Sequence, residues 1–454
     1  MNRRKQLSLN LCEACIVVNS FAPGSANRGH ANLSRFCLYA VCLLAWILLP
    51  ASMHAQGGSR QPTRVYNDRA LPPVTIPVQA LGYRPPGVLP AFSFYSLVNL
   101  QYVDASHLLF TFNTMGLLER DNNCSSNDSE RLVRAVILDV PSGKVEKQAT
   151  WKLYDFMDFL LNLGGGQFIL RNCSQLERVD SSLVPQPFIT LGGSLEDLIL
   201  SPDRSMVLVE EKPPAPTLKP QSGNAGSSVL SQQAASLLAS HPEQRITLNF
   251  IRLHPLGIAA RSHAPTAMYL PIVEGGVFEV LAAPKNRWDV TLQPLKGTTQ
   301  HIVSIRSACP PQLTAITDSI FAANMCPKSD QTVYEGYNLQ GALLWQIPLP
   351  PDLFLPRFIL TKNGARFAIE TIHATHPRAA LDPIDPNGVD AEVIAVYDTL
   401  TGNRIASFAT TPIYTAGTNV DFSPDGTHIA VLHNETIEIH DLHALANVQP
   451  ALPH

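Results

Sequence analysis

Three segments of the chain share one pattern, in which an alternating strand, a tight polar turn and a second alternating strand follow one another. The copies read LILSPDRSMVLVE at 198–210, FILTKNGARFAIE at 358–370 and VDFSPDGTHIAVL at 420–432. A unit of this size cannot bury its apolar face alone, so it must stack on neighbouring units. The repeat therefore predicts an all-β chain whose units form a β-propeller.

Weaker versions of the unit extend the pattern along the chain, and each is a turn-centred hairpin followed by a second pair of strands. Their spacing fits propeller blades of about 40 to 50 residues once insertions are allowed. We therefore expect a seven-bladed β-propeller with four-stranded antiparallel blades; six or eight blades are the alternatives. The seven turn centres lie near Asp104, Gly165, Asp203, Gly275, Asp318, Asn363 and Asp425.

The repeat turns consist of residues that favour tight turns. In the copy SPDG at 423–426, proline presets φ, aspartate caps the turn and glycine closes it. We therefore interpret the turn residues Asp203, Asn363, Asp425 and Gly426 as structural, rather than as ligands of a metal or a phosphate.

The N-terminal segment has the composition of an export signal. Arg35 precedes an uninterrupted apolar run from Phe36 to Leu49, and small residues around Ala55 follow it. The run is shorter than the roughly 18 to 20 residues that a membrane-spanning helix needs. We therefore predict a signal peptide at 1–55, an exported protein that is periplasmic or secreted, and no membrane span in the mature chain. An uncleaved anchor is the alternative.

The rest of the chain divides by composition. Two stretches interrupt the blade pattern, 212–244, which is rich in Pro, Ser, Gln and Ala, and 376–390. A ring of blades leaves an open edge unless the two ends of the chain share a blade, and we expect Val74–Ala80 or Phe92–Leu100 to supply the closing strand. The predicted segments are a flexible mature N-terminus at 56–73, a β-propeller at 74–445 with these two insertions, and a C-terminal tail at 446–454.

Cysteine use agrees with an oxidising compartment. Of the eight cysteines, the four that follow the predicted signal peptide are Cys124, Cys173, Cys309 and Cys326. An even number in an exported chain indicates disulfides. Cys309 and Cys326 flank a predicted hairpin, so we expect them to pair, which leaves Cys124 to pair with Cys173. A four-cysteine zinc site is the alternative, although no CxxC spacing supports it.

Charge excludes one class of partner. The chain has 37 acidic and 33 basic residues, and the basic residues of the predicted signal peptide would leave with it. A mildly acidic surface repels phosphate backbones, so we expect no nucleic-acid partner.

The last repeat carries a family resemblance. The stretch VDFSPDGTHIAVLHNETIEIHDL at 420–442 resembles the WD40-like and YVTN-type propeller repeats of bacterial envelope proteins, including the propeller of the Tol system. The resemblance implies a propeller fold and a binding role. It implies no catalytic residues, because these families share none.

One loop has the composition of a calcium site. Asp382, Asp385, Asn387 and Asp390 place oxygen-bearing side chains close together in sequence, and such hard ligands suit calcium. The spacing does not match an EF-hand, since no glutamate follows at the required position. A solvated acidic loop is the alternative to a metal site.

Local motifs of catalysis are absent from the sequence, which contains neither GxSxG nor HExxH. The segment GALLW at 341–345 resembles the tryptophan docking repeat of quinoproteins, but only Trp151, Trp288 and Trp345 follow the predicted signal peptide. We therefore expect no cofactor and no catalytic residues. The predicted function is that of a monomeric binding or scaffolding module for a protein or glycan partner in the envelope. A propeller enzyme, lactonase-like or quinoprotein-like, with residues converging on the central channel is the alternative.

Overall fold

The structure of the protein is a computed structural model. The chain divides into two compact units, Met1–Arg64 and Val65–His454, and every residue described below lies in the second. The predicted signal peptide at 1–55 and the tail beyond 446 lie outside the described residues. The structure describes residues 72, 74–85, 98–114, 131–153, 159–172, 175–212, 246–264, 271–273, 275–325, 332–376, 386–413 and 418–446.

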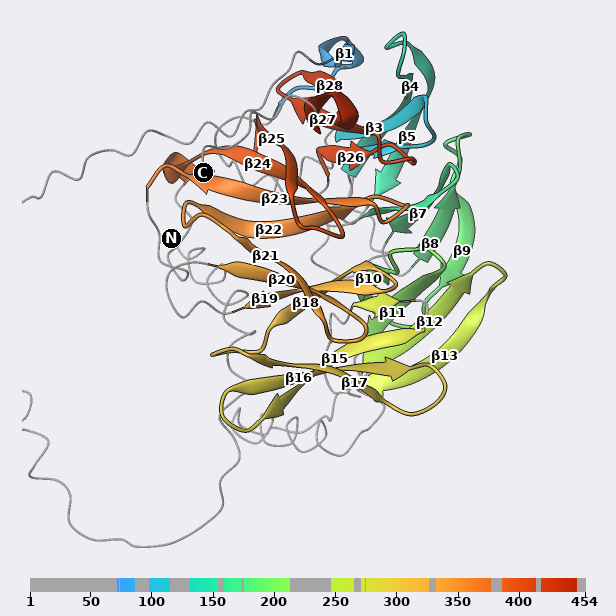
Figure 1. Cartoon of the computed structure of the whole chain (residues 1–454). Helices are drawn as coiled ribbons and strands as arrows, with labels where there is room; N and C mark the ends of the chain where they lie inside the picture. Colours follow the sequence, from blue (N-terminus) through green and yellow to red (C-terminus); the bar gives the residue numbers. More distant parts are fainter. Residues whose placement is uncertain are drawn as a thin grey trace, which may run out of the picture. The chain divides into compact units, whose positions relative to one another are not determined.

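Seven antiparallel sheets of four strands each make up the second unit (Figure 1), which confirms the predicted seven-bladed β-propeller. We number the blades in chain order, and the last blade takes its outermost strand from the beginning of the unit. The strands of blades 1 to 3 are β2 (Asn99–Tyr102), β3 (His107–Asn113), β4 (Arg131–Asp139), β5 (Val145–Leu153); β6 (Leu160–Gly164), β7 (Gln167–Asn172), β8 (Gln175–Val179), β9 (Gln186–Thr190); β10 (Ser194–Leu200), β11 (Met206–Lys212), β12 (Ile246–Leu253), β13 (Leu256–Ala264).

The remaining blades have the same arrangement. The strands of blades 4 to 7 are β14 (Ile272–Val273), β15 (Gly276–Ala283), β16 (Arg287–Pro294), β17 (Gln300–Arg306); β18 (Gln312–Thr317), β19 (Ile320–Met325), β20 (Val333–Asn338), β21 (Leu343–Pro348); β22 (Leu353–Leu360), β23 (Arg366–Ala374), β24 (Val389–Asp398), β25 (Arg404–Thr410); β26 (Val420–Phe422), β27 (His428–His433), β28 (Thr436–Asp441), β1 (Val74–Pro77).

Strand direction gives the ring two different ends. Neighbouring strands of a blade are antiparallel, so the turns after the first and third strands lie at one end, which we call the turn end. The connections after the second strand and between blades lie at the other end, which we call the insertion end. Both predicted insertions follow a second strand, since they join β11 to β12 and β23 to β24. They therefore leave the ring at the same end.

The ring closes through the two ends of the unit. Strand β1 pairs antiparallel with β28, so of the two segments expected to close the ring it is Val74–Ala80 that supplies the strand. Blade 1 also contacts blade 7 through its first strand, because Asn99 and Thr418 form a parallel bridge. The N–H of Leu100 donates to the carbonyl of Thr418 over 2.7 Å.

Seven clusters of buried apolar side chains lie between the blades, one for each pair of neighbours. The cluster between blades 7 and 1 contains Ile76, Leu100, Phe110 and Leu432. Its presence shows that the stack of sheets continues from the last blade to the first, as the burial requirement of each unit demands.

Helices are few and short in the described part of the chain. They are η2 (Gln79–Leu81), η4 (Pro386–Gly388) and α3 (Leu442–Ala446). Among the described residues, no helix has the length and apolarity needed to cross a membrane.

The repeat turns lie at the turn end, each between the first and second strands of a blade. In blade 3, Asp203 accepts hydrogen bonds from the Ser201 hydroxyl at 2.6 Å and the Ser205 N–H at 3.0 Å. In blade 7, Asp425 accepts from the Ser423 hydroxyl at 2.6 Å, and its pKa is lowered to about 2, mainly by that bond. The same aspartate position thus closes the turn in both copies.

A positive φ is required one residue after this position. Gly426 has φ 71° and Gly364, after Asn363, has φ 66°. In blade 3 the equivalent residue is Arg204, with φ 61°, a conformation that costs a non-glycine residue about 1 kcal/mol. Blade 3 therefore has a long cationic side chain, Arg204, at the turn end of the ring, where the other two repeats have glycine.

Candidate functional site

A groove of about 600 Å³ lies between blades 2 and 3. Its volume lies in the range of about 300 to 1,000 Å³ that is common for ligand sites. We call it the blade 2–3 groove. Its lining consists of Ile189, Thr190, Leu191, Gly192, Glu211, Thr247, Asn249, Ile251, Leu256, Gly257, Ile258, Arg261 and His263.

A β-bulge in β13 arranges one wall of the groove. The register shifts between the pairs Phe250↔Ala260 and Ile251↔Ile258, which leaves Ala259 as an extra residue. Side chains alternate along a strand, and the extra residue changes the phase of that alternation. Leu256 and Ile258 before the bulge therefore face the same side as Arg261 and His263 after it.

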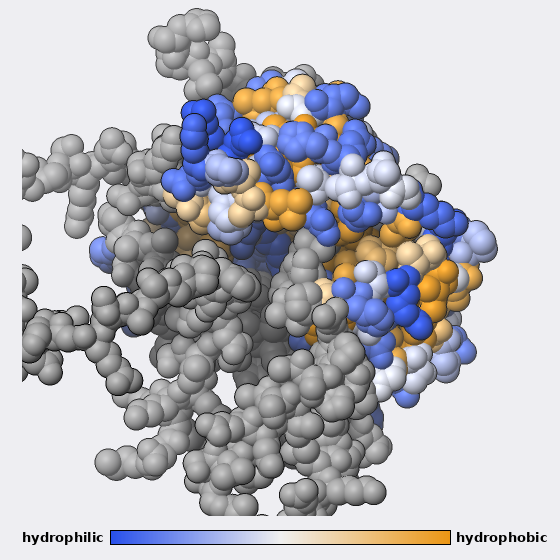
Figure 2. All heavy atoms as spheres, turned by 90° about the horizontal axis from the view of Figure 1, so that it is seen from below, coloured by the Kyte–Doolittle hydropathy of each residue, from blue (hydrophilic) through white to orange (hydrophobic). Residues whose placement is uncertain are grey.

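The groove is open because its two walls differ in length. The outer strand of blade 2, β9, has 5 residues, whereas β13 has 9. Blade 2 therefore cannot cover the whole facing surface of blade 3, and Leu256 and Ile258 remain 53% and 59% exposed. Apolar surface lies among polar surface on the right-hand side of Figure 2, the side on which Figure 1 shows β9 and β13.

Polar groups occupy the part of the groove nearer the insertion end. The Arg261 Nε donates to Asn249 Oδ1 at 2.8 Å, and the Asn249 amide donates to Glu211 Oε2 at 3.3 Å. The other oxygen of Glu211 accepts from the Gly193 N–H at 2.6 Å. The glutamate is thus satisfied locally, while the terminal amino groups of Arg261 have no acceptor among the described residues. The groove can therefore bind a ligand with apolar groups at one end and an anionic group at the other.

A second polar cluster lies at the turn end, where the first strands of several blades converge. Asp421 of blade 7 accepts a hydrogen bond from the N–H of Tyr102 of blade 1 at 2.7 Å. Arg204 of blade 3 donates to Asn162 of blade 2 at 3.1 Å. Burial raises the pKa of the Asp421 carboxyl to about 6, although the positive charge of Arg204 opposes the rise.

We call Tyr102, Asn162, Arg204 and Asp421 the axial cluster, and little space remains beside it. Tyr102, Asn162, Arg204 and Lys362 line a cavity of about 20 Å³, which is about the space that one water molecule needs. A Cβ on Gly164 would lie 2.7 Å from the Lys362 Nζ, so the lysine covers this position. The described side chains that meet near the axis at this end therefore pack close to one another.

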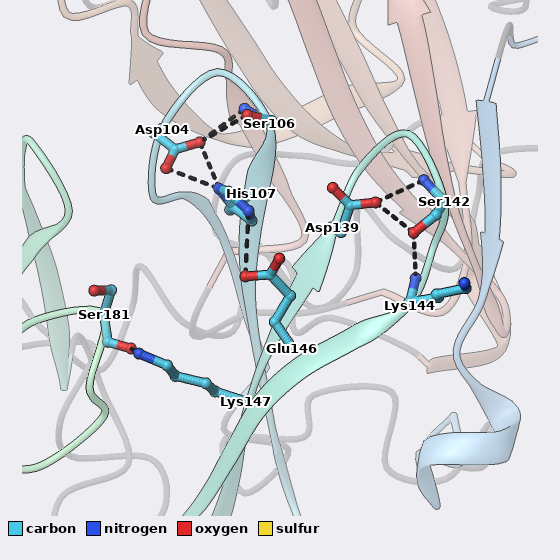
Figure 3. Close-up of polar contacts among 9 residues, drawn as sticks. All are labelled: Asp104, Ser106, His107, Asp139, Ser142, Lys144, Glu146, Lys147 and Ser181. Carbon is cyan, nitrogen blue, oxygen red and sulfur yellow. Dashed lines mark hydrogen bonds and ion pairs between the residues drawn. The ribbon is translucent and has the colours of Figure 1, made fainter.

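A third cluster joins the two hairpins of blade 1 (Figure 3). The Nδ1 of His107, at the start of β3, lies 2.8 Å from both carboxylate oxygens of Asp104, and its Nε2 lies 3.2 Å from Glu146 Oε2. Asp139, at the end of β4, pairs with His107 across the strands and accepts from the Ser142 N–H at 2.9 Å. His107, Asp139 and Glu146 can bring ligand atoms within 4.8 Å of one another, a spacing that could hold a metal ion.

The electrostatics favour a different role for this cluster. The hydrogen bond that Asp104 accepts raises the pKa of the His107 imidazole, and the charges of Asp104 and Glu146 add to the effect. A metal at Nε2 would compete with Glu146 for that ring nitrogen. We therefore assign the cluster as an ion-pair network that ties the hairpins of blade 1 together.

The structure describes two of the four predicted calcium ligands, Asn387 and Asp390. Asp390 lies with its Oδ1 2.6 Å from the His373 Nδ1, and Asp352 lies 3.3 Å from the other ring nitrogen of that histidine. Asn387 is an exposed residue of η4, while Asp382 and Asp385 lie outside the described residues. A calcium site on this loop stays a prediction, and the histidine between two carboxylates is a feature that the sequence reasoning missed.

One half of one predicted disulfide is described. Cys309, in the connection between blades 4 and 5, is disulfide-bonded. Its partner is not described, because Cys124, Cys173 and Cys326 all lie outside the described residues. Strand β19 ends at Met325, at the same end of the ring as the connection that contains Cys309. The pairing of Cys309 with Cys326 stays a prediction.

The blade 2–3 groove is not among the sites predicted from the sequence. The segment LGIAARSHA at 256–264 offered one signal, because its apolar residues Leu256 and Ile258 lie on an outer strand and are exposed. The wall formed by blade 2 offered no comparable signal. The length of β9 opens the groove only because β13 is longer, and this comparison requires the two strands to be known as neighbours.

Known proteins resemble the chain in fold. It is similar to the structures of TolB from Acinetobacter baumannii (11% identity, 69% of this chain and 79% of that chain covered, TM-score 0.34) and a putative TolB from Agrobacterium tumefaciens (11%, 69% and 99%, 0.38). It is also similar to an oligogalacturonate lyase from Vibrio parahaemolyticus (12%, 76% and 89%, 0.38). Similarities this distant say nothing about function. No family model matches the chain, and no curated protein matches it, so its assignment to the WD40-like and YVTN-type repeats stays a prediction.

Proposed function

We propose that the protein is an exported, non-enzymatic β-propeller of the cell envelope that binds a partner protein in the blade 2–3 groove. The observation that carries this proposal is the uncovered wall of blade 3, where Leu256 and Ile258 are more than half exposed beside a groove of about 600 Å³. Large apolar side chains grouped at a concave surface are typical of interaction sites.

Rigidity of the surroundings supports the same function. The floor of the groove is continuous with the buried cluster between blades 2 and 3, to which Ile251 and Leu191 belong. Binding there needs little ordering of the protein, which lowers the entropic cost of association. The polar end of the groove, with Arg261, can fix the orientation of a bound partner, which an apolar surface alone does not do.

The alternative of a propeller enzyme requires reacting groups and a substrate around the channel. At the turn end, the converging side chains leave about 20 Å³ beside them, and Asp421 already accepts the N–H of Tyr102. This close packing at the turn end supports the binding role. Metal-dependent hydrolysis of a lactone or phosphoester by the purified protein would overturn the non-enzymatic assignment.

Capture from an envelope extract with matched variants tests the proposed site. Ile258→Asp places a charge on the groove wall, and Leu400→Asp places the same charge at a 70% exposed residue of blade 6. Because both side chains are exposed, neither variant is expected to alter the circular dichroism spectrum. We expect wild type and Leu400→Asp to retain the same partner and Ile258→Asp to lose it. Equal retention by all three proteins would exclude the groove as the docking site.

A further inference from the structure

We propose that the partner binds as an extended strand that pairs with the free edge of β13 and becomes a fifth strand of blade 3. This inference rests on the proposed binding in the blade 2–3 groove and specifies how the partner is held. Its occupant is a peptide segment with apolar side chains toward Ile258 and a carboxylate toward Arg261.

The first observation is that β13 has an open edge. It is the last strand in the order β10-β11-β12-β13, so one row of its backbone N–H and C=O groups has no strand beside it in the sheet. Such a row is a template for pairing with another chain, and proteins usually block it with proline, charge, short length or a covering element.

Four of the other outer strands carry such protection, and β17 is shorter than β13, with 7 residues, and begins with the polar residues Gln300 and His301. Strand β5, also of 9 residues, contains Glu146, Lys147 and Lys152, while β9 contains Pro187 and β21 ends at Pro348. Strand β25 is in contact with α3. These features oppose the addition of a strand to the edges of those blades.

Strand β13 is less protected along its 9 residues. It contains no proline, and its one permanent charge is Arg261. It begins with Leu256 and Ile258, both more than half exposed. A long, apolar edge strand is expected to aggregate unless a partner covers it, and strand addition is the covering that satisfies its backbone groups.

The side chains of β13 define the chemistry of the added strand. Leu256 and Ile258 lie on the groove side near the turn end, and Arg261 and His263 lie on the same side near the insertion end. Directly opposed side chains on neighbouring strands interact, so an apolar residue suits Ile258 and an acidic residue suits Arg261.

The charge of Arg261 is available to such a residue. Its Nε donates to the side-chain Oδ1 of Asn249, and Glu211 accepts from the Gly193 N–H and from the side-chain amide of Asn249. The terminal amino groups of Arg261 therefore retain the geometry for a bidentate bond to a carboxylate.

Synthetic peptides provide the test with the full chain. The parent peptide is short, alternates Val with Thr and carries Glu near one end; a second peptide has Lys in place of Glu, and a third is N-methylated along its backbone. We expect the parent to bind and the Lys peptide to bind about tenfold more weakly. Arg261→Glu should reverse that preference, and N-methylation should abolish binding while leaving the side chains unchanged.

Amide hydrogen exchange distinguishes strand addition from simple docking. Binding of the parent peptide should protect amides of β13, since they would become hydrogen-bonded. Equal binding of the N-methylated peptide without such protection would overturn strand addition and leave the proposed groove intact. The β13 amides could also be protected in the free protein, at concentrations where it dimerises. That result would show that a second copy of the chain covers this edge, and it would overturn the proposed peptide partner. The capture experiment tests the groove independently of strand addition. If Ile258→Asp captures as much partner as the wild type does, the groove is not the binding site.

Discussion

The backbone N–H of Tyr102 donates to the Asp421 carboxylate at 2.7 Å, although 319 residues separate the two positions. The bond joins the first strands of blades 1 and 7 where the ring closes. It also holds a carboxyl group inside the ring, where burial raises its pKa to about 6. The closure of the ring is therefore coupled to pH.

The first prediction concerns this coupling. Because the folded-state pKa of Asp421 lies above the unfolded value near 3.8, its contribution to stability is fully present below about pH 4 and is lost as the pH rises through about 6. A shift of this size corresponds to about 3 kcal/mol, and we expect about 2 kcal/mol because Asp421 is only partly buried. In Asp421→Asn this pH-dependent part should vanish. Urea unfolding between pH 4 and 7 measures it, and parallel curves for the two proteins would contradict the assignment.

The second prediction concerns the turn residue with positive φ. Arg204→Gly removes the strain at φ 61°, but it also removes the positive charge that lowers the pKa of Asp421. We therefore expect the pKa of Asp421 to rise further above its ordinary value. The loss of stability with rising pH should move to higher pH in urea unfolding experiments, and an unchanged midpoint would show that the two charges do not interact.

The third prediction concerns the closing strand. Ile76 of β1 is 1% exposed in the cluster between blades 7 and 1, so Ile76→Ala should reduce the free energy of unfolding by about 2 to 4 kcal/mol. Thr75→Ala, at an exposed position of the same strand, is the matched control and should change it by less than about 0.5 kcal/mol. Equal effects would mean that β1 does not close the ring through its buried face.

The fourth prediction concerns the ion-pair network of blade 1. The hydrogen bond with Asp104 raises the pKa of His107, so Asp104→Asn should lower it. A raised histidine pKa stabilises the fold at low pH, and this contribution is lost as the pH rises through the folded-state pKa. Titration of the His107 ring protons by NMR measures both proteins. A higher midpoint in the variant would contradict the assignment.

The fifth prediction concerns the disulfide of Cys309. We expect Cys326 to be its partner, and the bond to contribute about 3 kcal/mol through loop closure. Peptide mapping without reduction of the protein recovered from the envelope identifies the partner. A peptide linking Cys309 to another cysteine, or a free Cys309 thiol, would disprove the pairing.

Much of the fold could be predicted because its signals are local. The turns with Asp203, Asn363 and Asp425 each combine a cap and a positive φ within a few residues, and such turns mark the first hairpin of a blade. Alternating apolar residues around them fix the two faces of each sheet. The number of blades follows from counting these units.

The groove could not be predicted in the same way, because it depends on comparisons between distant segments. Its wall needs the bulge at Ala259, which the sequence does not mark, and its opening needs β9 to be shorter than β13. The axial cluster has the same origin, since Tyr102, Arg204 and Asp421 come from three blades. Only the closed ring brings such residues together.

Site-specific photocrosslinking tests the central claim most directly. A photoreactive amino acid is placed at Ile258 in one protein and at Leu400, the more exposed control of blade 6, in another, and each is irradiated in the native envelope. The proposed function predicts a single partner protein linked at position 258, through an extended segment with acidic and apolar residues, and no such product at position 400. The same products at both positions, or none at position 258, would contradict binding in the blade 2–3 groove.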